Sequence, residues 1–97
     1  MSQVVTLVIL IETKNGCSNE QIEAFKKLAP LVLAEDGCIA YELTQVTDDE
    51  NRFVLFEKWR SMDALRIHDA TSHMKAADIH SASFRAKPAT VLFVQNV

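Results

Sequence analysis

The chain has 97 residues, of which 48% are hydrophobic, and a formal net charge of -3. A chain of this length builds one small core, so we predict a single domain over residues 1–97. The two glycines and two prolines are too few for a disordered chain, and the scattered charges form no basic cluster that would bind nucleic acid.

Two further features predict the compartment. The apolar run over residues 4–11 is too short to span a bilayer, and it lacks the basic and small-residue flanks of a signal peptide. Cys17 and Cys38 are too few for a disulfide framework. We therefore expect a soluble, cytoplasmic protein with reduced thiols and no membrane partner.

The first strand and helix are predicted from the N-terminal third of the chain. Residues 4–13 (VVTLVILIET) are rich in Val, Ile and Thr, which predicts a strand. Ser18 and Gln21 have the spacing of a capping box, with Ser18 as the helix N-cap. Apolar residues then recur at helical spacing up to a stop at Gly37. Because this pattern continues in phase beyond Pro30, we predict a bend there rather than a break.

A β-hairpin is predicted in the middle of the chain. Residues 38–46 alternate between apolar and polar side chains, which is the period of a strand. A polar turn over residues 48–51 separates them from a third strand over residues 52–59.

The C-terminal part predicts two helical stretches and a last strand. Ser61 can cap a short helix, and the pair Thr71 and Ser72 interrupts it and offers a new cap. A further helix runs to about Phe84, and residues 89–95 form the last strand. The order β-α-β-β-α-β is that of a ferredoxin-like α+β fold with an antiparallel sheet.

The strands also predict a homodimer. Apolar side chains stand at consecutive positions within residues 4–11, 53–56 and 91–94, so both faces of the sheet require burial. The helices of this fold cover one face, and a large bare apolar face is rare on a soluble monomer. We expect a second copy to cover it, sheet against sheet, about a two-fold axis. A monomer with an open apolar face is the alternative.

Several side chains near the third strand and the helices after it could carry chemistry: Glu57, Trp59, His68, Ser72, His73 and His80. Glu57 and Trp59 share one face of the strand, so Trp59 would form a wall of a pocket if that face lies under the helices. His68 would point from its helix back to the sheet. A histidine at the edge of an apolar pocket can accept a proton near neutral pH.

The same residues have plainer interpretations. His68 could satisfy a neighbouring backbone group, Trp59 could be a core residue, and Glu57 could stabilise a helix N-terminus. No glycine-rich phosphate loop or serine nucleophile elbow is present. Because His68 and His73 are five residues apart, off the i, i+4 spacing of ligands on one helix face, we predict no metal site.

The segment over residues 37–77 resembles the antibiotic biosynthesis monooxygenase family. The pattern is G-C-x-x-Y-x-L, a polar turn, and then R-F-x-x-x-E-x-W-x-[SD]-x-x-A-L-x-x-H-x-x-[ST]-x-H-[FM]. Its elements in this chain are Gly37, Cys38, Tyr41, Leu43, Arg52, Phe53, Glu57, Trp59, Ser61, Ala64, Leu65, His68, Ser72, His73 and Met74. The resemblance implies a dimeric α+β barrel.

The resemblance also implies an activity, because some family members oxidise anthrones or quinols with O₂ and without a cofactor. The leading hypothesis is therefore a cofactor-independent monooxygenase of a small phenolic, quinol or anthrone-like substrate. His68 would be the general base, oriented by Glu57 or His73. The substrate pocket would be formed by Trp59, Leu55, Phe53, Phe56, Leu65 and Ser72.

Other branches of the family give alternatives. The haem-degrading branch uses an Asn in the first strand and a Trp near the position of His68, and this chain has neither. The anthrone-oxidising branch uses an Asn where this chain has Leu55. A second hypothesis is an isomerase of a small phosphorylated carbonyl compound, with a basic residue holding the phosphate. The candidates for that residue are Arg52, Arg66, Lys75, Arg85 and Lys87. A third is a non-catalytic dimer that binds a small aromatic molecule.

Overall fold

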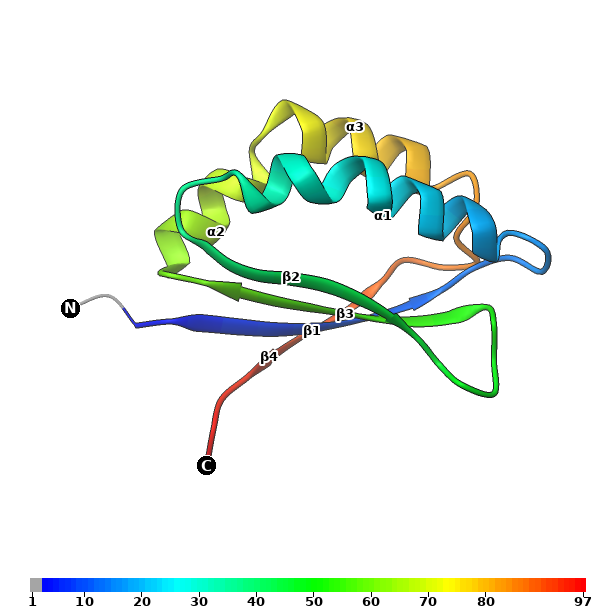
Figure 1. Ribbon diagram of the computed structural model, residues 1–97, viewed down its shortest axis with the longest axis horizontal. Helices are drawn as coiled ribbons and strands as arrows, with labels where there is room; N and C mark the ends of the chain where they lie inside the picture. Colours follow the sequence, from blue (N-terminus) through cyan, green and yellow to red (C-terminus); the bar gives the residue numbers. More distant parts are fainter. Residues whose placement is uncertain (1–2) are drawn as a thin grey trace.

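The computed structural model describes residues 3–97 and has the predicted ferredoxin-like α+β fold (Figure 1). The strands are β1 (Val5–Glu12), β2 (Cys38–Gln45), β3 (Arg52–Trp59) and β4 (Thr90–Val94). The helices are α1 (Ser18–Leu33), α2 (Met62–Asp69) and α3 (Ser72–Ser81). The second helical region is thus divided in two, as the Thr71-Ser72 interruption predicted.

The four strands form an antiparallel sheet in the order β2-β3-β1-β4. All three helices lie on one side of it (Figure 1). Leu7 is paired with Glu57 and Ile11 with Phe53, so these side chains share the face under the helices. The core packs on that face and consists of Leu7, Ile11, Ala29, Val32, Tyr41, Phe53, Leu55, Trp59, Ala64 and Leu65.

The alternation of burial along β3 shows which of its faces lies under the helices. Phe53, Leu55, Glu57 and Trp59 are buried, and the residues between them are more exposed. Phe56 is one of the residues in between and is paired with Val8 on the other face. Because side chains alternate with a period of two, Phe56 and Trp59 lie on opposite faces of the sheet. The prediction that Phe56 lines the same pocket as Trp59 is therefore wrong.

The helix caps agree with the sequence in two cases of three. Ser61 Oγ accepts a hydrogen bond from the Ala64 backbone N–H, and Thr71 Oγ1 accepts one from Met74. The capping box at Ser18 is wrong, since Cys17 is the N-cap of α1 and makes no side-chain cap bond. The Gln21 side chain is instead buried and accepts a hydrogen bond from Arg85 Nε.

The longest helix is α1, with 16 residues. It continues through Pro30 to Leu33, so the proline does not break it. Within residues 3–97, no helix combines the length and the apolar character needed to cross a membrane.

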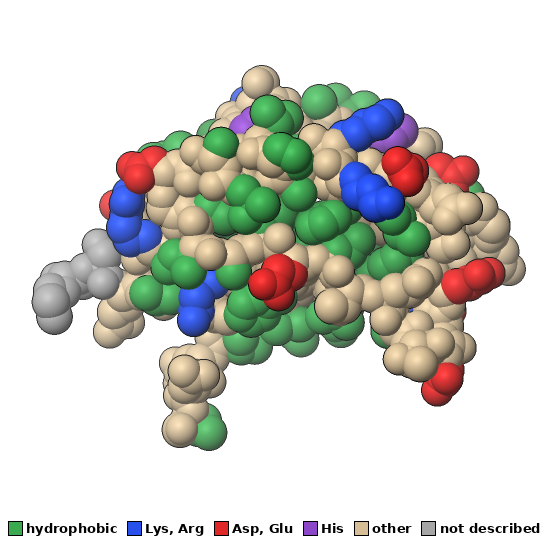
Figure 2. Space-filling model, in the orientation of Figure 1, with side chains coloured by type: hydrophobic (Ala, Val, Ile, Leu, Met, Phe, Trp, Pro, Cys, Tyr) green, Lys and Arg blue, Asp and Glu red, His purple; other side chains and the backbone are tan. Residues whose placement is uncertain are grey.

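The side of the sheet that faces away from the helices is apolar, as predicted. We call it the open face, and its apolar residues are Val8, Leu10, Val54, Phe56, Leu92 and Val94. Leu10, Leu92 and Val94 are 42%, 43% and 42% exposed. In Figure 2 hydrophobic side chains gather along the lower side of the molecule, where no helix covers the sheet. All five residues of β4 are exposed, including those on its helix side.

A tight approach at Gly37 fixes the start of β2 against α2, and it gives a test of this packing. Gly37 has φ +92°, and a Cβ there would lie 2.7 Å from Ala64 Cβ. Gly37→Ala should therefore lower the free energy of unfolding by about 2–5 kcal/mol, from about 1–2 for the left-handed backbone and about 1–3 for overpacking. Urea denaturation measures this change.

Gly16→Ala is the matched control. Gly16 has φ +80°, but a Cβ there would meet no atom within 4 Å. It should therefore cost only the backbone strain, about 1–2 kcal/mol. Equal losses in the two variants would contradict the tight approach.

Candidate active site

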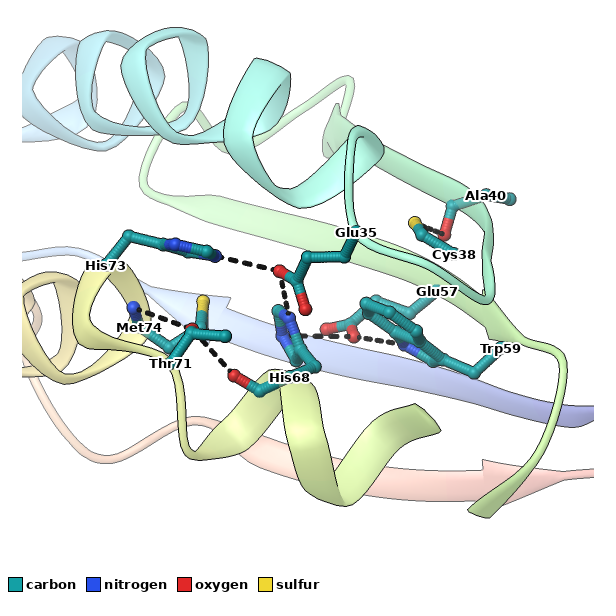
Figure 3. A network of polar contacts seen from close by, with 9 residues as sticks. All are labelled: Glu35, Cys38, Ala40, Glu57, Trp59, His68, Thr71, His73 and Met74. Atoms are coloured by element: carbon teal, nitrogen blue, oxygen red, sulfur yellow. Dashed lines mark hydrogen bonds and ion pairs between the residues drawn. The ribbon is translucent and has the colours of Figure 1, made fainter. Parts of the chain in front are cut away.

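A single carboxylate joins three helices near one end of the molecule. Glu35 follows the last turn of α1, and its backbone N–H donates to Val32 at 3.0 Å. Its Oε2 atom lies 2.9 Å from His68 Nδ1 and 2.8 Å from His73 Nε2. Figure 3 shows Glu35 between the two histidines, His68 on α2 and His73 on α3. The carboxylate therefore ties α1 to both helices of the second helical region.

These contacts are the basis for assigning the hydrogen atoms of the two rings. An ionised carboxylate oxygen only accepts, so we assign a hydrogen to the nitrogen that faces Glu35 in each ring, Nδ1 of His68 and Nε2 of His73. The Glu35 side chain is 11% exposed, and its Oε1 atom is buried without a hydrogen-bond partner in the described residues.

His68 is the most enclosed member of the group. Its side chain is 1% exposed, and its ring centre lies 4.4 Å from that of Trp59. His68 Nε2 is 3.9 Å from Glu57 Oε1, and the same oxygen accepts a hydrogen bond from Trp59 Nε1 at 2.9 Å. His68 thus stands between two carboxylates, as Figure 3 shows.

The break between α2 and α3 brings the second histidine to Glu35. Thr71 Oγ1 donates to the His68 carbonyl at 2.8 Å and accepts from the Met74 N–H at 3.3 Å. One side chain thereby ends α2 and starts α3. His68 and His73 stand on different helices, so the spacing argument against their sharing a ligand does not apply to them.

Burial raises the pKa of the Glu57 carboxyl, although the Trp59 hydrogen bond and the charge of His68 oppose the shift. Burial likewise raises the pKa of the Tyr41 hydroxyl and, together with the nearby charges of Glu35 and Glu57, that of the Cys38 thiol. The region around the two histidines is therefore one where charge is poorly solvated.

A cavity of about 620 Å³ opens beside this group, between α1, α3 and the strands β2 and β3. Its apolar wall includes Phe25, Leu28, Tyr41, Leu43, Leu55 and Phe84. Its polar groups include His73, His80 and Arg85. The volume and the mostly apolar wall are typical of a site for a small molecule of two or three rings. In Figure 2 hydrophobic side chains surround the middle of the view, between α1 and β2.

The structure places the predicted site residues in different surroundings. His73 lines the cavity and its side chain is 22% exposed, whereas His68 does not line it. His68 contacts Glu35, which also contacts His73. Among the expected pocket residues, Leu55 lines the cavity, while Phe53, Trp59 and Leu65 are core residues beside it. Ser72 is exposed at the start of α3, outside the cavity wall.

Glu35 is a residue of the candidate site that the sequence did not predict. Its partners lie 33 and 38 residues away in the chain, so no local motif marks it. The helical periodicity of α1 does include position 35, because it follows Phe25, Leu28 and Val32 at a spacing of three or four residues. A buried stripe that ends on a carboxylate indicates a partner across the core.

The same three residues are the ones that could hold a metal ion. Glu35, His68 and His73 place their ligand atoms within 4.8 Å of one another. The two nitrogen-to-oxygen distances are those of hydrogen bonds, and a hydrogen-bonded network accounts for them fully. The sequence-based expectation of no metal site stays a prediction.

The comparisons with known proteins agree with the fold. The family model described as "Antibiotic biosynthesis monooxygenase" matches residues 4–78. The chain is 30% identical over 83 residues to "Probable quinol monooxygenase YgiN" of Escherichia coli K12, covering 75% of this chain and 80% of that protein. It is 29% identical over 72 residues to "Putative monooxygenase YcnE" of Bacillus subtilis, with 74% and 76% covered.

A solved structure named as an antibiotic biosynthesis monooxygenase from Caulobacter crescentus superposes with a TM-score of 0.91. It is 27% identical, and the match covers 99% of this chain and 92% of that one. The matched range 4–78 contains Glu35, Glu57, Trp59, His68 and His73.

The raised pKa of Glu57 predicts a pH-dependent effect of Glu57→Gln. Because the folded protein holds the Glu57 proton more tightly than the unfolded chain, this residue's contribution to wild-type stability falls as pH rises above 4.5, the ordinary pKa of a glutamate. The amide keeps an acceptor for Trp59 Nε1 but carries no charge. The melting temperature of Glu57→Gln relative to wild type should therefore rise between pH 4.5 and pH 8.

Glu50→Gln, at an exposed carboxylate in the β2–β3 turn, is the control and should show no such trend. Calorimetry over this pH range measures both variants. A Glu57→Gln difference that stays constant or falls with pH would contradict the assignment.

Proposed function

The chain belongs to the antibiotic biosynthesis monooxygenase family, and on that premise we propose that it is a cofactor-independent monooxygenase of a small phenolic or quinol substrate. The single observation that carries the proposal is His73, which lines the apolar cavity while its Nε2 atom is held by the buried Glu35 carboxylate. Relatives named as a quinol monooxygenase and a monooxygenase support the reaction class.

In the proposed reaction His73 Nδ1 takes the phenolic proton of a substrate bound in the cavity. The Glu35 carboxylate stabilises the imidazolium that forms, as a carboxylate does when it is hydrogen-bonded to the far nitrogen of a base. His68 contacts both Glu35 and Glu57, and Trp59 donates a hydrogen bond to Glu57. His73 is therefore the proposed catalytic residue, and the other four are positioning residues.

The chemistry balances without an added reductant. The phenolate passes one electron to O₂, and recombination of the two radicals forms a carbon–oxygen bond. Loss of water from the resulting hydroperoxide leaves a quinone. Overall, phenol and O₂ give quinone and water, and each product receives one of the two atoms of O₂. The substrate supplies all four electrons, which is why a flavin or metal is not required by the stoichiometry. The partial burial of His73 and Glu35, whose side chains are 22% and 11% exposed, strengthens the ion pair that forms between them.

We also propose that the protein is a homodimer formed through the open face. The observations that support it are the exposed apolar residues Leu10, Leu92 and Val94 and the exposure of all of β4. A second copy related by a two-fold axis would present the same apolar surface in return, so one face covers the other.

Oxygen uptake tests the proposed activity. The protein, treated with EDTA, is mixed with 1,4-naphthohydroquinone or anthrone, and uptake is compared with the autoxidation blank. Wild type should exceed the blank, and His73→Ala should lower kcat by about 10²–10⁴-fold, the usual contribution of a positioned base. Ile79→Ala, at an exposed position on the same helix and outside the cavity wall, should keep wild-type rates.

Uptake that is unchanged in His73→Ala would remove His73 as the base. No wild-type uptake with any phenol or quinol would instead favour the isomerase or the binding protein.

Sedimentation of Leu92→Glu tests the dimer. A charge buried in an apolar interface is costly, so this variant should sediment as a monomer at concentrations where wild type is a dimer. Ile67→Glu, at a 68% exposed site on α2, should remain dimeric. A monomeric wild type, or a dimer that tolerates Leu92→Glu, would contradict the open-face interface.

A further inference from the structure

Arg85 differs from the other arginines of the chain. Arg52, Arg60 and Arg66 are exposed, and each forms an ion pair with a carboxylate. Arg85 is half-buried and lines the cavity. Within residues 3–97, no carboxylate oxygen lies within 4.0 Å of its nitrogens.

The surrounding structure holds this guanidinium in place. The Arg85 backbone N–H donates to Ser81 at 2.9 Å, and the residue forms an antiparallel bridge with Thr13. Its side-chain Nε donates to Gln21 Oε1 at 3.1 Å, and Gln21 is only 4% exposed. This bond uses one of the five N–H donors of the guanidinium. The outer edge, with its two terminal nitrogens, has no side-chain acceptor among the described residues.

A half-buried cation without a counter-charge costs free energy, as the lowered pKa of Arg85 reflects. The groups whose charge opposes that lowering are Tyr41 and the exposed Asp78. Glu20 and Glu23 stand on the α1 side of the cavity, but both are exposed, so water and salt screen them. An anion within the cavity would relieve the cost more effectively than any of these groups.

We propose that Arg85 is the anion anchor of the cavity, and that the substrate is a fused-ring phenol or quinol that carries a carboxylate or another anionic oxygen group. A guanidinium fork matches two oxygens of one acid group, which a single lysine does not do. The apolar wall between Arg85 and His73 takes the rings. The acid group at Arg85 then sets which ring position reaches the base.

The length of α3 favours a substrate that has more than one ring. His73 is in the first turn of α3, and Arg85 follows its last turn. The ten residues of this helix span about 15 Å at about 1.5 Å per residue. A molecule that contacts both groups must therefore cover much of the cavity, which a two-ring acid does better than a one-ring acid.

This inference extends the proposed function and relies on it for the role of His73, but its test uses binding alone. Anaerobic calorimetry compares 5-hydroxy-1-naphthoate, whose hydroxyl and acid group stand on different rings, with 1-naphthol, which has the same rings and hydroxyl but no acid group. Wild type should bind the acid at least tenfold more tightly. Arg85→Gln should weaken binding of the acid by about 10- to 100-fold, the usual value of charge-assisted hydrogen bonds, and leave 1-naphthol within threefold.

Two further variants separate charge, geometry and folding. Arg85→Lys keeps the charge but lacks the fork, so it should retain part of the preference for the acid. Arg66→Gln removes an exposed arginine outside the cavity and should keep all of it. Melting temperatures report whether each variant is folded. 1-Naphthyl phosphate serves as a third probe, and tighter binding of this phosphate than of the carboxylate would identify a phosphate ester as the anionic group.

Equal affinity of wild type for the acid and for 1-naphthol would overturn the proposal, and this comparison needs no variant. A preference for the acid that survives in folded Arg85→Gln would overturn it as well. If wild type oxidises neutral quinols but shows no preference for the acid, only the anion anchor fails. If it prefers the acid but consumes no oxygen, only the monooxygenase proposal fails.

Discussion

The Glu35 carboxylate is the constraint on which the arrangement of the site depends. One oxygen accepts from histidines on α2 and α3, while the residue itself closes α1. A largely buried carboxylate must be compensated, and here the hydrogen-bond donors come from side chains on two other helices. The position of His73 at the cavity wall follows from this bond, because Thr71 starts α3 just where the next turn reaches Glu35.

The buried residues His68, Glu57 and Trp59 support Glu35, which orients the proposed base His73. His68 fills the space between Glu35 and Glu57, and Trp59 donates to Glu57 from the strand. His68, His73, Glu57 and Trp59 stand on helices or strands, and rigid elements hold a site more precisely than loops do. Glu35 itself lies just after α1, and its Oε1 atom has no hydrogen-bond partner among the described residues. It marks the place where the group still has capacity to accept a hydrogen bond.

The sequence predicted the fold well because its information is local. Alternation and helical periodicity give each element, and the Thr71-Ser72 interruption correctly divided the second helical region. Most of the differences arise from contacts between distant residues. Gln21 has the spacing of a capping box, but its side chain bonds Arg85, 64 residues away. The contacts of Glu35 with the two histidines were missed for the same reason, and it is His73 rather than His68 that lines the cavity. A period of two also does not say which face a strand buries, so Phe53 and Phe56 were placed together.

The central proposal is that a phenolic oxygen in the cavity contacts the Nδ1 atom of His73. The most direct measurement is a crystal structure of the protein soaked anaerobically with 5-hydroxy-1-naphthoate. The phenolic oxygen should lie about 2.6–3.2 Å from His73 Nδ1, with the Nε2 bond to Glu35 intact. A naphthoate that binds with its hydroxyl away from His73, or that lies outside the cavity, would contradict it.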